Sequence, residues 1–180
     1  MSKITLKGII GHTKTVLRHK KVVFVHCCKA GIVWQGIVHD LSKFTPAEFI
    51  PGIKYFQGFR SPNEAEREDI GYSNAWIHHK GVNNHHYEHW TDFSLDKKEY
   101  VPVKMPLKYV KEMFCDRVAA SKIYRGDKYQ QTDPYGYLKN RTTQEHIHPE
   151  TAKLLEEMLR KLAEEGEDAA FAYIRSLHTY

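Results

Sequence analysis

Apolar residues at helical spacing near the start of the chain restrict the fold more than any other feature of the sequence. One face of a helix predicted over residues 8–28 gathers Ile9, Val16, Val23 and Cys27. Histidines recur every seven residues beside that face, at His12, His19 and His26. Because seven residues make about two helical turns, all three imidazoles lie near the apolar stripe. Gly31 closes the segment.

The rest of the chain shows the same helical pattern, and no segment alternates as a convincing strand would. We predict further helices over residues 32–43, from Pro46 through a disturbance at Pro51, from Pro62 to His79, and over 106–124, 149–165 and 167–177. Residues 85–106, with a short helix at 86–91, and residues 127–148 are predicted to be connections. The predicted fold class is therefore all-α.

Two of the predicted helices begin with a recognisable start signal. Thr45-Pro46-Ala47-Glu48 has the pattern of a capping box, and Ser61-Pro62-Asn63-Glu64 repeats it. In such a box the hydroxyl and the Glu carboxylate bond backbone amides at the start of the helix. Proline at the first helical position supports both starts.

Length and composition suit one globular domain, since the chain has 180 residues of which 41% are hydrophobic and 27% charged. No apolar run approaches the roughly 20 residues that span a bilayer, and polar residues interrupt the N-terminal segment. We therefore expect neither a membrane anchor nor a secretory signal. Cys27, Cys28 and Cys115 form no CxxC pair and are predicted to be reduced thiols, which favours a cytoplasmic location.

The charge is distributed unevenly along the chain. Residues 1–60 hold 10 Lys and Arg against 2 Asp and Glu, a balance of +8, whereas residues 145–180 hold 4 against 8, a balance of −4. The basic first third suits a small anionic substrate such as a phosphate ester, and the alternative is a solvated basic face. The one basic run is Arg18-His19-Lys20-Lys21, without a nucleic-acid-binding motif, so no nucleic-acid partner is predicted.

The first functional signal is the segment Gly36-Ile37-Val38-His39-Asp40-Leu41-Ser42-Lys43-Phe44. Neutral imidazole and carboxylate both bind divalent first-row metals, and neighbours on a helix point about 100° apart. His39 and Asp40 could therefore serve one metal from two sides, or two neighbouring metals. If the first two helices pack antiparallel about a turn near residue 30, His19 and His39 lie at nearly the same level. This geometry favours His19 over His26 as the partner of His39.

A second signal is the set of five histidines within twelve residues: His78, His79, His85, His86 and His89. A structural histidine usually occurs singly, so we expect at least two of these to bind a metal or a phosphate. Which member of each adjacent pair points inward is left open. Asp116 lies in an otherwise apolar helix, where a carboxylate is costly to bury unless it is paired or binds a metal. Pairing with Arg117 or a nearby Lys is the alternative.

These motifs together resemble the HD-domain superfamily of metal-dependent phosphohydrolases: His19, His39-Asp40 with Lys43, the histidines of residues 78–86, and Asp116. The resemblance covers about residues 10–125 of a single domain, residues 1–180, in which helices at about 149–178 are accessory. The chain also resembles a small bacterial and phage family of unknown function within or near that superfamily. That similarity lies in His39-Asp40-Leu41-Ser42-Lys43-Phe44, Trp76-Ile77-His78-His79-Lys80-Gly81 and Met113-Phe114-Cys115-Asp116-Arg117.

The resemblance implies an HD-domain-like helical bundle that holds one or two divalent transition metals, iron or manganese. The core ligands it implies are His19, His39, Asp40 and Asp116, and one or two of His78, His79, His85 and His86 would complete a second metal. Asp40 would also orient a water molecule. Lys43 takes the place of a lysine near the phosphate, and Arg60 or Lys80 could add positive charge there.

Three functions are compatible with these features. The leading hypothesis is a hydrolase that acts on a phosphate ester, such as a nucleotide, with metal-bound water as the nucleophile. The second is a di-iron oxygenase of the same superfamily, which the six-ligand pattern permits. The third is a non-catalytic protein with a structural metal or a nucleotide-binding pocket. Lys43 and the basic first third favour the hydrolase, since a structural metal needs neither.

Overall fold

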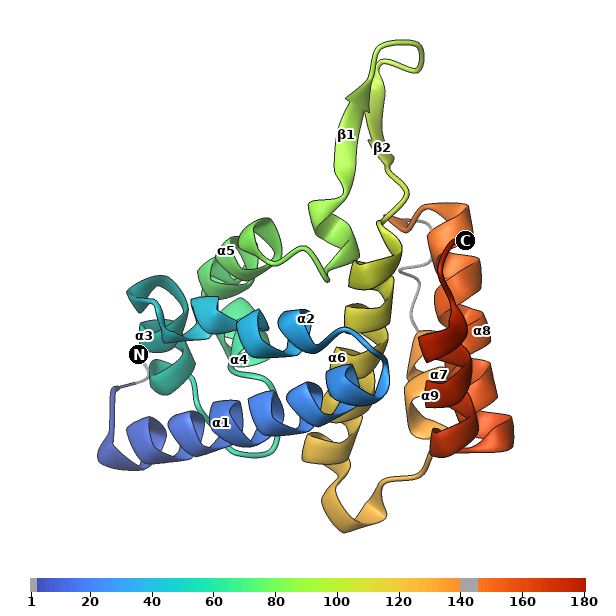
Figure 1. Ribbon diagram of the computed structural model, residues 1–180. Helices are drawn as coiled ribbons and strands as arrows, with labels where there is room; N and C mark the ends of the chain where they lie inside the picture. The colour runs from blue at the N-terminus through green and yellow to red at the C-terminus, as the bar shows by residue number, and fades with distance from the viewer. Residues whose placement is uncertain (1–2, 140–145) are drawn as a thin grey trace.

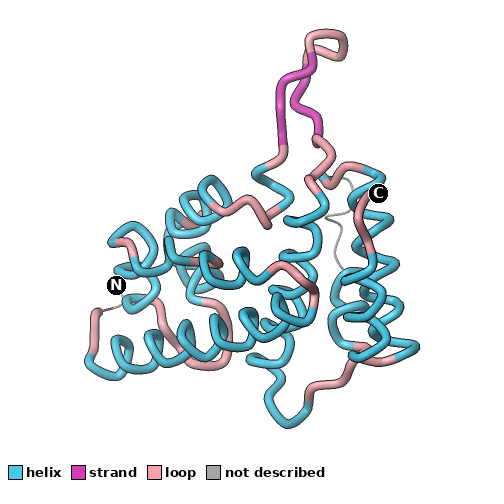
Figure 2. The backbone as a smooth tube through the Cα atoms, in the orientation of Figure 1, coloured by secondary structure: helices cyan, strands magenta, loops and turns pink. Residues whose placement is uncertain are grey.

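One helix, α6 (Leu107–Arg125), runs through the middle of the molecule, with the other elements on either side of it (Figure 1). The computed structural model describes residues 3–139 and 146–180. On one side of α6 lie α1 (Leu6–Lys29), α2 (Val33–Val38), α3 (Pro46–Lys54), α4 (Pro62–Ile70) and α5 (Asn74–Val82). On the other side lie α7 (Asp133–Lys139), α8 (Pro149–Glu165) and α9 (Glu167–Ser176). The all-α prediction is confirmed, as the tube in Figure 2 shows.

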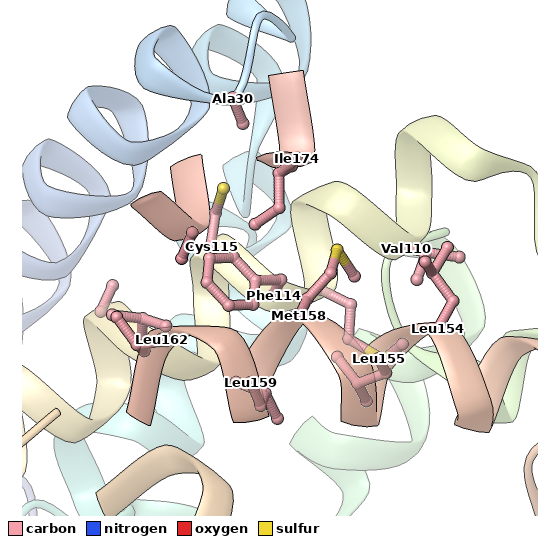
Figure 3. Packing of buried hydrophobic residues seen from close by; sticks show 14 of the residues in the cluster. Ala30, Val110, Phe114, Cys115, Leu154, Leu155, Met158, Leu159, Leu162 and Ile174 are labelled. Carbon is pink, nitrogen blue, oxygen red and sulfur yellow. The ribbon is translucent and has the colours of Figure 1, made fainter. Parts of the chain in front are cut away.

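The hydrophobic core lies where α6, α8 and α9 meet (Figure 3). Phe114 of α6 is fully buried and packs edge-to-face on Phe171 of α9, with ring centroids 5.7 Å apart. The amphipathic pattern of α8 buries a continuous stripe made of Leu154, Leu155, Met158, Leu159 and Leu162. This burial fixes the position of α6, because its apolar face cannot leave α8 and α9 without exposing these side chains to water.

An ion-pair network also ties α1, α6 and α9 together. Glu167, at the start of α9, accepts hydrogen bonds from Lys29 of α1 at 2.8 Å and from Lys122 of α6 at 2.5 Å. Lys122 also lies 3.1 Å from the Nε2 of His26. Burial opposes ionisation of the Glu167 carboxyl, but the two lysines outweigh it and lower its pKa to about 2. The three helices are therefore cross-linked by charge as well as by apolar packing.

The second predicted helix, over residues 32–43, is wrong in its second half. Helix α2 ends at Val38, and the chain turns through His39 and Asp40 into the short 3-10 helix η1 (Leu41–Phe44). Asp40 adopts the left-handed conformation, with φ 54° and ψ 26°. A helix cannot continue through that conformation, so His39 and Asp40 lie in a tight turn rather than on one helix face.

The predicted helix from Pro62 to His79 is two helices, α4 and α5. Gly71, with φ 85°, ends α4 in the left-handed conformation that glycine adopts without strain. Ser73 then caps α5, because its hydroxyl accepts a hydrogen bond from the amide of Trp76. The Gly71-Tyr72-Ser73 segment thus carries both a stop and a start signal.

The connection predicted over residues 85–106 contains a hairpin, which corrects the expectation that the chain has no strand. The 3-10 helix η2 (Tyr87–His89) leads into β1 (Thr91–Ser94), which pairs antiparallel with β2 (Glu99–Pro102), Thr91 opposite Pro102. The hairpin extends away from the helices (Figure 1). Each strand has four residues, and most are exposed on both faces, so neither shows the apolar alternation that predicts a strand.

The remaining expectations for the connections and the cysteines have clear outcomes. The connection predicted over 127–148 contains the 3-10 helix η3 (Gly126–Lys128) and α7, while residues 140–145 lie outside the described part of the chain. Cys27, Cys28 and Cys115 are all free thiols, as predicted. Among the described residues, none of the helices combines the length and apolar character needed to cross a bilayer.

Candidate metal centre

Imidazole and carboxylate groups from five segments converge between α1, α5 and α6. The segments are α1 with His19, the turn after α2 with His39 and Asp40, α5 with His79, the loop after α5 with His85 and His86, and α6 with Glu112 and Asp116. Most of these side chains are almost inaccessible to water; His39, Asp40 and His85 are each 1–2% exposed. A buried polar cluster of this kind is stable only if its groups satisfy one another or bind an ion.

One group of four, called the first subsite below, contains His19, His39, Asp40 and Asp116. The Nε2 of His19 lies 2.9 Å from Asp116 Oδ1, and the Nε2 of His39 lies 3.4 Å from Asp40 Oδ2. The two imidazole rings have centroids 5.7 Å apart. The structure thus brings His19 level with His39, as the spacing about the turn at residue 30 predicts.

A second group of four, called the second subsite below, contains Asp40, His79, His85 and His86. The Nε2 atoms of His79 and His85 each lie 3.4 Å from Asp40 Oδ1. The ring of His86 packs on both of theirs, with centroids 4.7 Å from His79 and 4.2 Å from His85. Asp40 therefore belongs to both subsites, with Oδ2 toward the first and Oδ1 toward the second.

The local backbone explains why Asp40 can reach both groups. The left-handed conformation at Asp40 reverses the chain directly after α2, which places the carboxylate inside the cluster. Lys20 of α1 holds this turn, because its ammonium donates hydrogen bonds to the backbone oxygens of Ile37, at 2.8 Å, and His39, at 2.7 Å. Lys43 of η1 lies 2.7 Å from Asp40 Oδ2. The turn is thus fixed by one lysine on its backbone and one on its carboxylate.

Two further carboxylates bind the outer nitrogens of the histidines. Glu112 Oε1 accepts a hydrogen bond from His39 Nδ1 at 2.9 Å and lies 3.1 Å from His85 Nδ1. Glu48 of α3 accepts from His79 Nδ1 at 2.7 Å and from His78 Nδ1 at 2.8 Å. In a neutral imidazole, a carboxylate on Nδ1 holds the proton there and leaves the lone pair of Nε2 free to bind a metal. The rings of His39, His79 and His85 are therefore oriented by carboxylates in the way that is typical of metal-binding histidines.

Electrostatics keeps the carboxylates of the centre ionised. Burial alone would raise the pKa of Asp40, but His39 and Lys43 outweigh burial and hold that pKa well below its ordinary range. The same balance, with His19 and His39 as the cationic partners, lowers the pKa of Asp116. Burial opposes the charged form of His39, yet the carboxylates around it, Asp40 first, raise its pKa well above the ordinary value.

His86 differs from His39 because it faces other imidazoles. Burial lowers its pKa well below the ordinary value, and the neighbouring His85 and His79 lower it further. His86 is consequently a neutral imidazole at physiological pH. Neutral imidazole and ionised carboxylate are the forms in which these side chains bind metals.

Unpartnered atoms provide a test of whether a metal fits. Among the described residues, five buried atoms of the centre find no hydrogen-bond partner: His19 Nε2, His39 Nε2, Asp40 Oδ1, His85 Nε2 and His86 Nε2. In each subsite the candidate ligand atoms lie within 4.8 Å of one another. Ligands about 2.0–2.2 Å from one ion can lie up to about 4.4 Å apart, so small side-chain movements would close either set around an ion. The residues fit one or two first-row divalent metals, with imidazole and carboxylate as donors.

Some residues considered from the sequence lie outside both subsites. His78 turns away from them and bonds Glu48, with 36% of its side chain exposed. His26 lies 3.2 Å from the backbone oxygen of Cys115 and packs on Phe171 in the core. Arg60 forms a bidentate pair with Glu68. Lys80 borders a separate surface hollow together with Tyr87, Glu88 and Thr91.

The sequence patterns missed Glu48 and Glu112 as partners of the centre. The capping box assigned to Glu48 is wrong, because its carboxylate reaches the histidines of α5 and the Thr45 hydroxyl bonds the Ser42 carbonyl instead. Glu112 precedes Asp116 by four residues and so lies on the same face of α6. That spacing is the one signal in the sequence that could have placed Glu112 beside the centre.

Comparison with known proteins identifies a family but no activity. The chain matches the family described as "Family of unknown function (DUF5662)" over residues 8–161, a segment that contains every candidate ligand of both subsites. No curated protein and no solved structure matches the chain.

Proposed function

The chain belongs to the DUF5662 family of unknown function, and we propose that it is a metal-dependent phosphohydrolase of the HD-domain type, acting on a small phosphate ester such as a nucleotide. The observation that carries this proposal is the position of Asp40. Its two carboxylate oxygens face separate sets of imidazoles, and Lys43 lies beside one of them. The three free thiols agree with the cytoplasmic location that we propose for the enzyme.

The centre would hold one or two divalent ions through His19, His39, Asp40 and Asp116 and through His79, His85 and His86. A bound divalent metal supplies Lewis acidity and lowers the pKa of a coordinated water to near neutrality. Asp40 supplies an ionised carboxylate between the two subsites, which can orient a water molecule by accepting its hydrogen bond. Burial keeps bulk water from screening these charges.

Lys43 provides the positive charge that a phosphoryl group requires. Its side chain is 29% exposed, so the ammonium lies at the boundary between the buried centre and solvent. Burial opposes the charged form of the ammonium, but the carboxylates of Asp40 and Asp116 outweigh burial and raise the pKa of Lys43. The lysine therefore stays protonated and can stabilise negative charge on phosphoryl oxygens as that charge develops. Arg60 already pairs with Glu68, so it is not part of this proposal.

The first experiment is elemental analysis of the purified protein without added metal, beside Asp40→Asn and the matched control Asp92→Asn. Asn tolerates the left-handed conformation of Asp40, so this variant changes the ligand and keeps the turn. Asp92 is exposed on the hairpin. We expect about one or two equivalents of iron or manganese in the wild type and the control, and loss of metal in Asp40→Asn.

The second experiment is a screen of phosphomonoesters and nucleotides with manganese, magnesium and cobalt. We expect hydrolysis by the wild type, and Lys43→Met should bind metal yet lower kcat by about 100-fold, the typical effect of losing one oxyanion-stabilising group. Absence of transition metal even after reconstitution would overturn the proposal. Oxygen consumption by the iron-loaded protein, without hydrolysis, would support the oxygenase hypothesis instead. Bound metal without either activity would support a non-catalytic site.

A further inference from the structure

Glu112 stands between the two subsites, and we propose that it is a positioning residue for both. In this inference, which rests on the metal centre of the proposed function, one carboxylate oxygen holds His39 for the ion of the first subsite and His85 for the ion of the second. Metal binding at the two subsites would then depend on a single side chain that ligates neither ion.

The contacts of Glu112 carry the inference. Its Oε1 lies 2.9 Å from His39 Nδ1 and 3.1 Å from His85 Nδ1, and these two rings have centroids 4.4 Å apart. With Nδ1 turned to Glu112, each ring directs Nε2 to the opposite side, toward Asp40. The Nε2 of His39 lies 3.4 Å from Asp40 Oδ2, and the Nε2 of His85 lies 3.4 Å from Asp40 Oδ1.

The position of Glu112 on α6 makes it a rigid support. The residue is 4% exposed, and Val110, Met113 and Phe114 around it are buried in the core that fixes the helix. Its neighbour Lys111 points elsewhere, because its ammonium donates to the backbone oxygen of Leu177. A carboxylate on a fixed helix constrains its hydrogen-bonded imidazoles more tightly than one on a mobile loop does.

Glu48 makes the same kind of contact but serves one subsite. Of its two imidazole partners, His79 belongs to the second subsite and His78 to neither. Glu66 provides a buried carboxylate outside the centre. It is 3% exposed, and it accepts hydrogen bonds from the hydroxyl of Ser73 and the amide of Ala75. The three glutamates therefore differ in how many subsites they support, although all three are buried.

The test is a titration of the metal-free protein with Mn²⁺ against a competing chelator, for the wild type, Glu112→Gln, Glu48→Gln and Glu66→Gln. A neutral amide keeps the shape but loses the charge-assisted bond to the imidazole. We expect Glu112→Gln to weaken both binding steps by about 10- to 100-fold, the usual cost of losing an outer-sphere partner. Two ions should still bind at high metal concentration.

The other two variants separate a positioning role from general damage. Glu48→Gln should weaken one binding step only, and Glu66→Gln should leave both within about twofold of the wild type, although all three change a buried carboxylate. The inference is overturned if Glu112→Gln binds both ions as the wild type does, or weakens one step alone. It is also overturned if Glu66→Gln matches Glu112→Gln, because the effect would then follow from burial rather than position.

A measurement on the wild type covers the case in which Glu112→Gln does not fold. Nitrogen-15 NMR of the histidine rings in the Zn²⁺-loaded protein reports which ring nitrogen bears a proton. We expect Nδ1 to be protonated in both His39 and His85; a metal bond at Nδ1 of either ring contradicts the inference. Because neither experiment uses a substrate, a wild type that binds two ions but hydrolyses nothing contradicts the phosphohydrolase and leaves the role of Glu112 in place.

Discussion

At the scale of single residues, Asp40 combines a buried charge with a backbone conformation that few side chains adopt. Its φ of 54° lies in the left-handed region, where Asp and Asn are the side chains that strain least after glycine. The surrounding bonds hold this conformation, since Lys20 binds the backbone of the turn and Lys43 binds the carboxylate. Strain of this kind persists where neighbouring groups over-determine the structure, which is typical of functional sites.

The two histidines of α5 allow a matched pair of substitutions. His78 and His79 both donate to Glu48, so His78→Ala and His79→Ala each remove one partner of the same carboxylate. Only His79 belongs to the second subsite. We expect His79→Ala to lose one of two metal equivalents and His78→Ala to keep both, as measured by elemental analysis after dialysis. Equal metal loss in the two variants would contradict the assignment of His79, and not His78, as a ligand.

At the scale of secondary-structure elements, the close contact between α1 and α2 positions the turn that carries His39 and Asp40. Gly36 of α2 makes this contact possible. A Cβ atom at Gly36 would lie 2.8 Å from the Cβ of Cys27 and 3.2 Å from the Cα of Phe24, both in α1. The Cα of Phe24 is a backbone atom, and the Cβ of Cys27 is attached directly to the backbone. Neither can move aside alone, so α2 would have to shift as a unit.

We expect Gly36→Ala to destabilise the protein by about 1–3 kcal/mol, the usual cost of overpacking, and to weaken metal binding because α2 leads directly into the His39–Asp40 turn. Gly136→Ala in α7 is the control, since a Cβ there meets nothing within 4 Å. It should be neutral or stabilise by up to about 1 kcal/mol. Urea unfolding in a chelator gives the stability, and a metal titration gives the affinity. If Gly36→Ala is destabilised but binds metal as tightly as the wild type, the position of α2 does not control the geometry of the centre.

At the scale of the whole molecule, α6 connects the hydrophobic core to the metal centre. Phe114 and Val118 are fully buried in the core, while Glu112 and Asp116 reach the two subsites. Among the described residues, no candidate ligand comes from α8 or α9, yet these helices pack against the helix that carries Glu112 and Asp116 (Figure 3). The geometry of the centre therefore depends on packing on the far side of α6.

The hairpin, by contrast, contributes little to this packing. It extends from the body of the molecule, and its base is closed by a hydrogen bond of 2.8 Å from the amide of Val103 to the oxygen of Trp90 (Figure 1). We expect that replacing residues 91–102 with a two-residue Asn-Gly turn changes the free energy of unfolding by less than about 0.5 kcal/mol, as for exposed changes away from packed sites. Metal stoichiometry should also stay the same. Loss of metal in this variant would show that the hairpin supports the metal centre.

The sequence by itself determined four of the long helices and several residues of the centre. Periodicity predicts α1, α8 and α9 to within a few residues, because each buries one apolar stripe that repeats along its own length. The predicted bounds of α6 are equally close, although α6 buries residues on several faces, Lys111 and Glu112 among them. The prediction that His19 and His39 lie side by side depends only on the helical rise per residue and on the turn near residue 30. The four-residue spacing of Glu112 and Asp116 places both on one face of α6 in the same way. These properties are local, so a one-dimensional pattern contains them.

Only the tertiary structure decided which atoms meet. The choice of His79 over His78 depends on which ring faces Asp40, a residue of the distant turn after α2. The role of Glu112 depends on a contact with His39 across 73 residues. The turn at Asp40 is likewise held by Lys20, from another helix. Contacts between separate helices depend on how those helices cross, and the packing of the core around α6 sets that crossing, which no periodic pattern along one segment records.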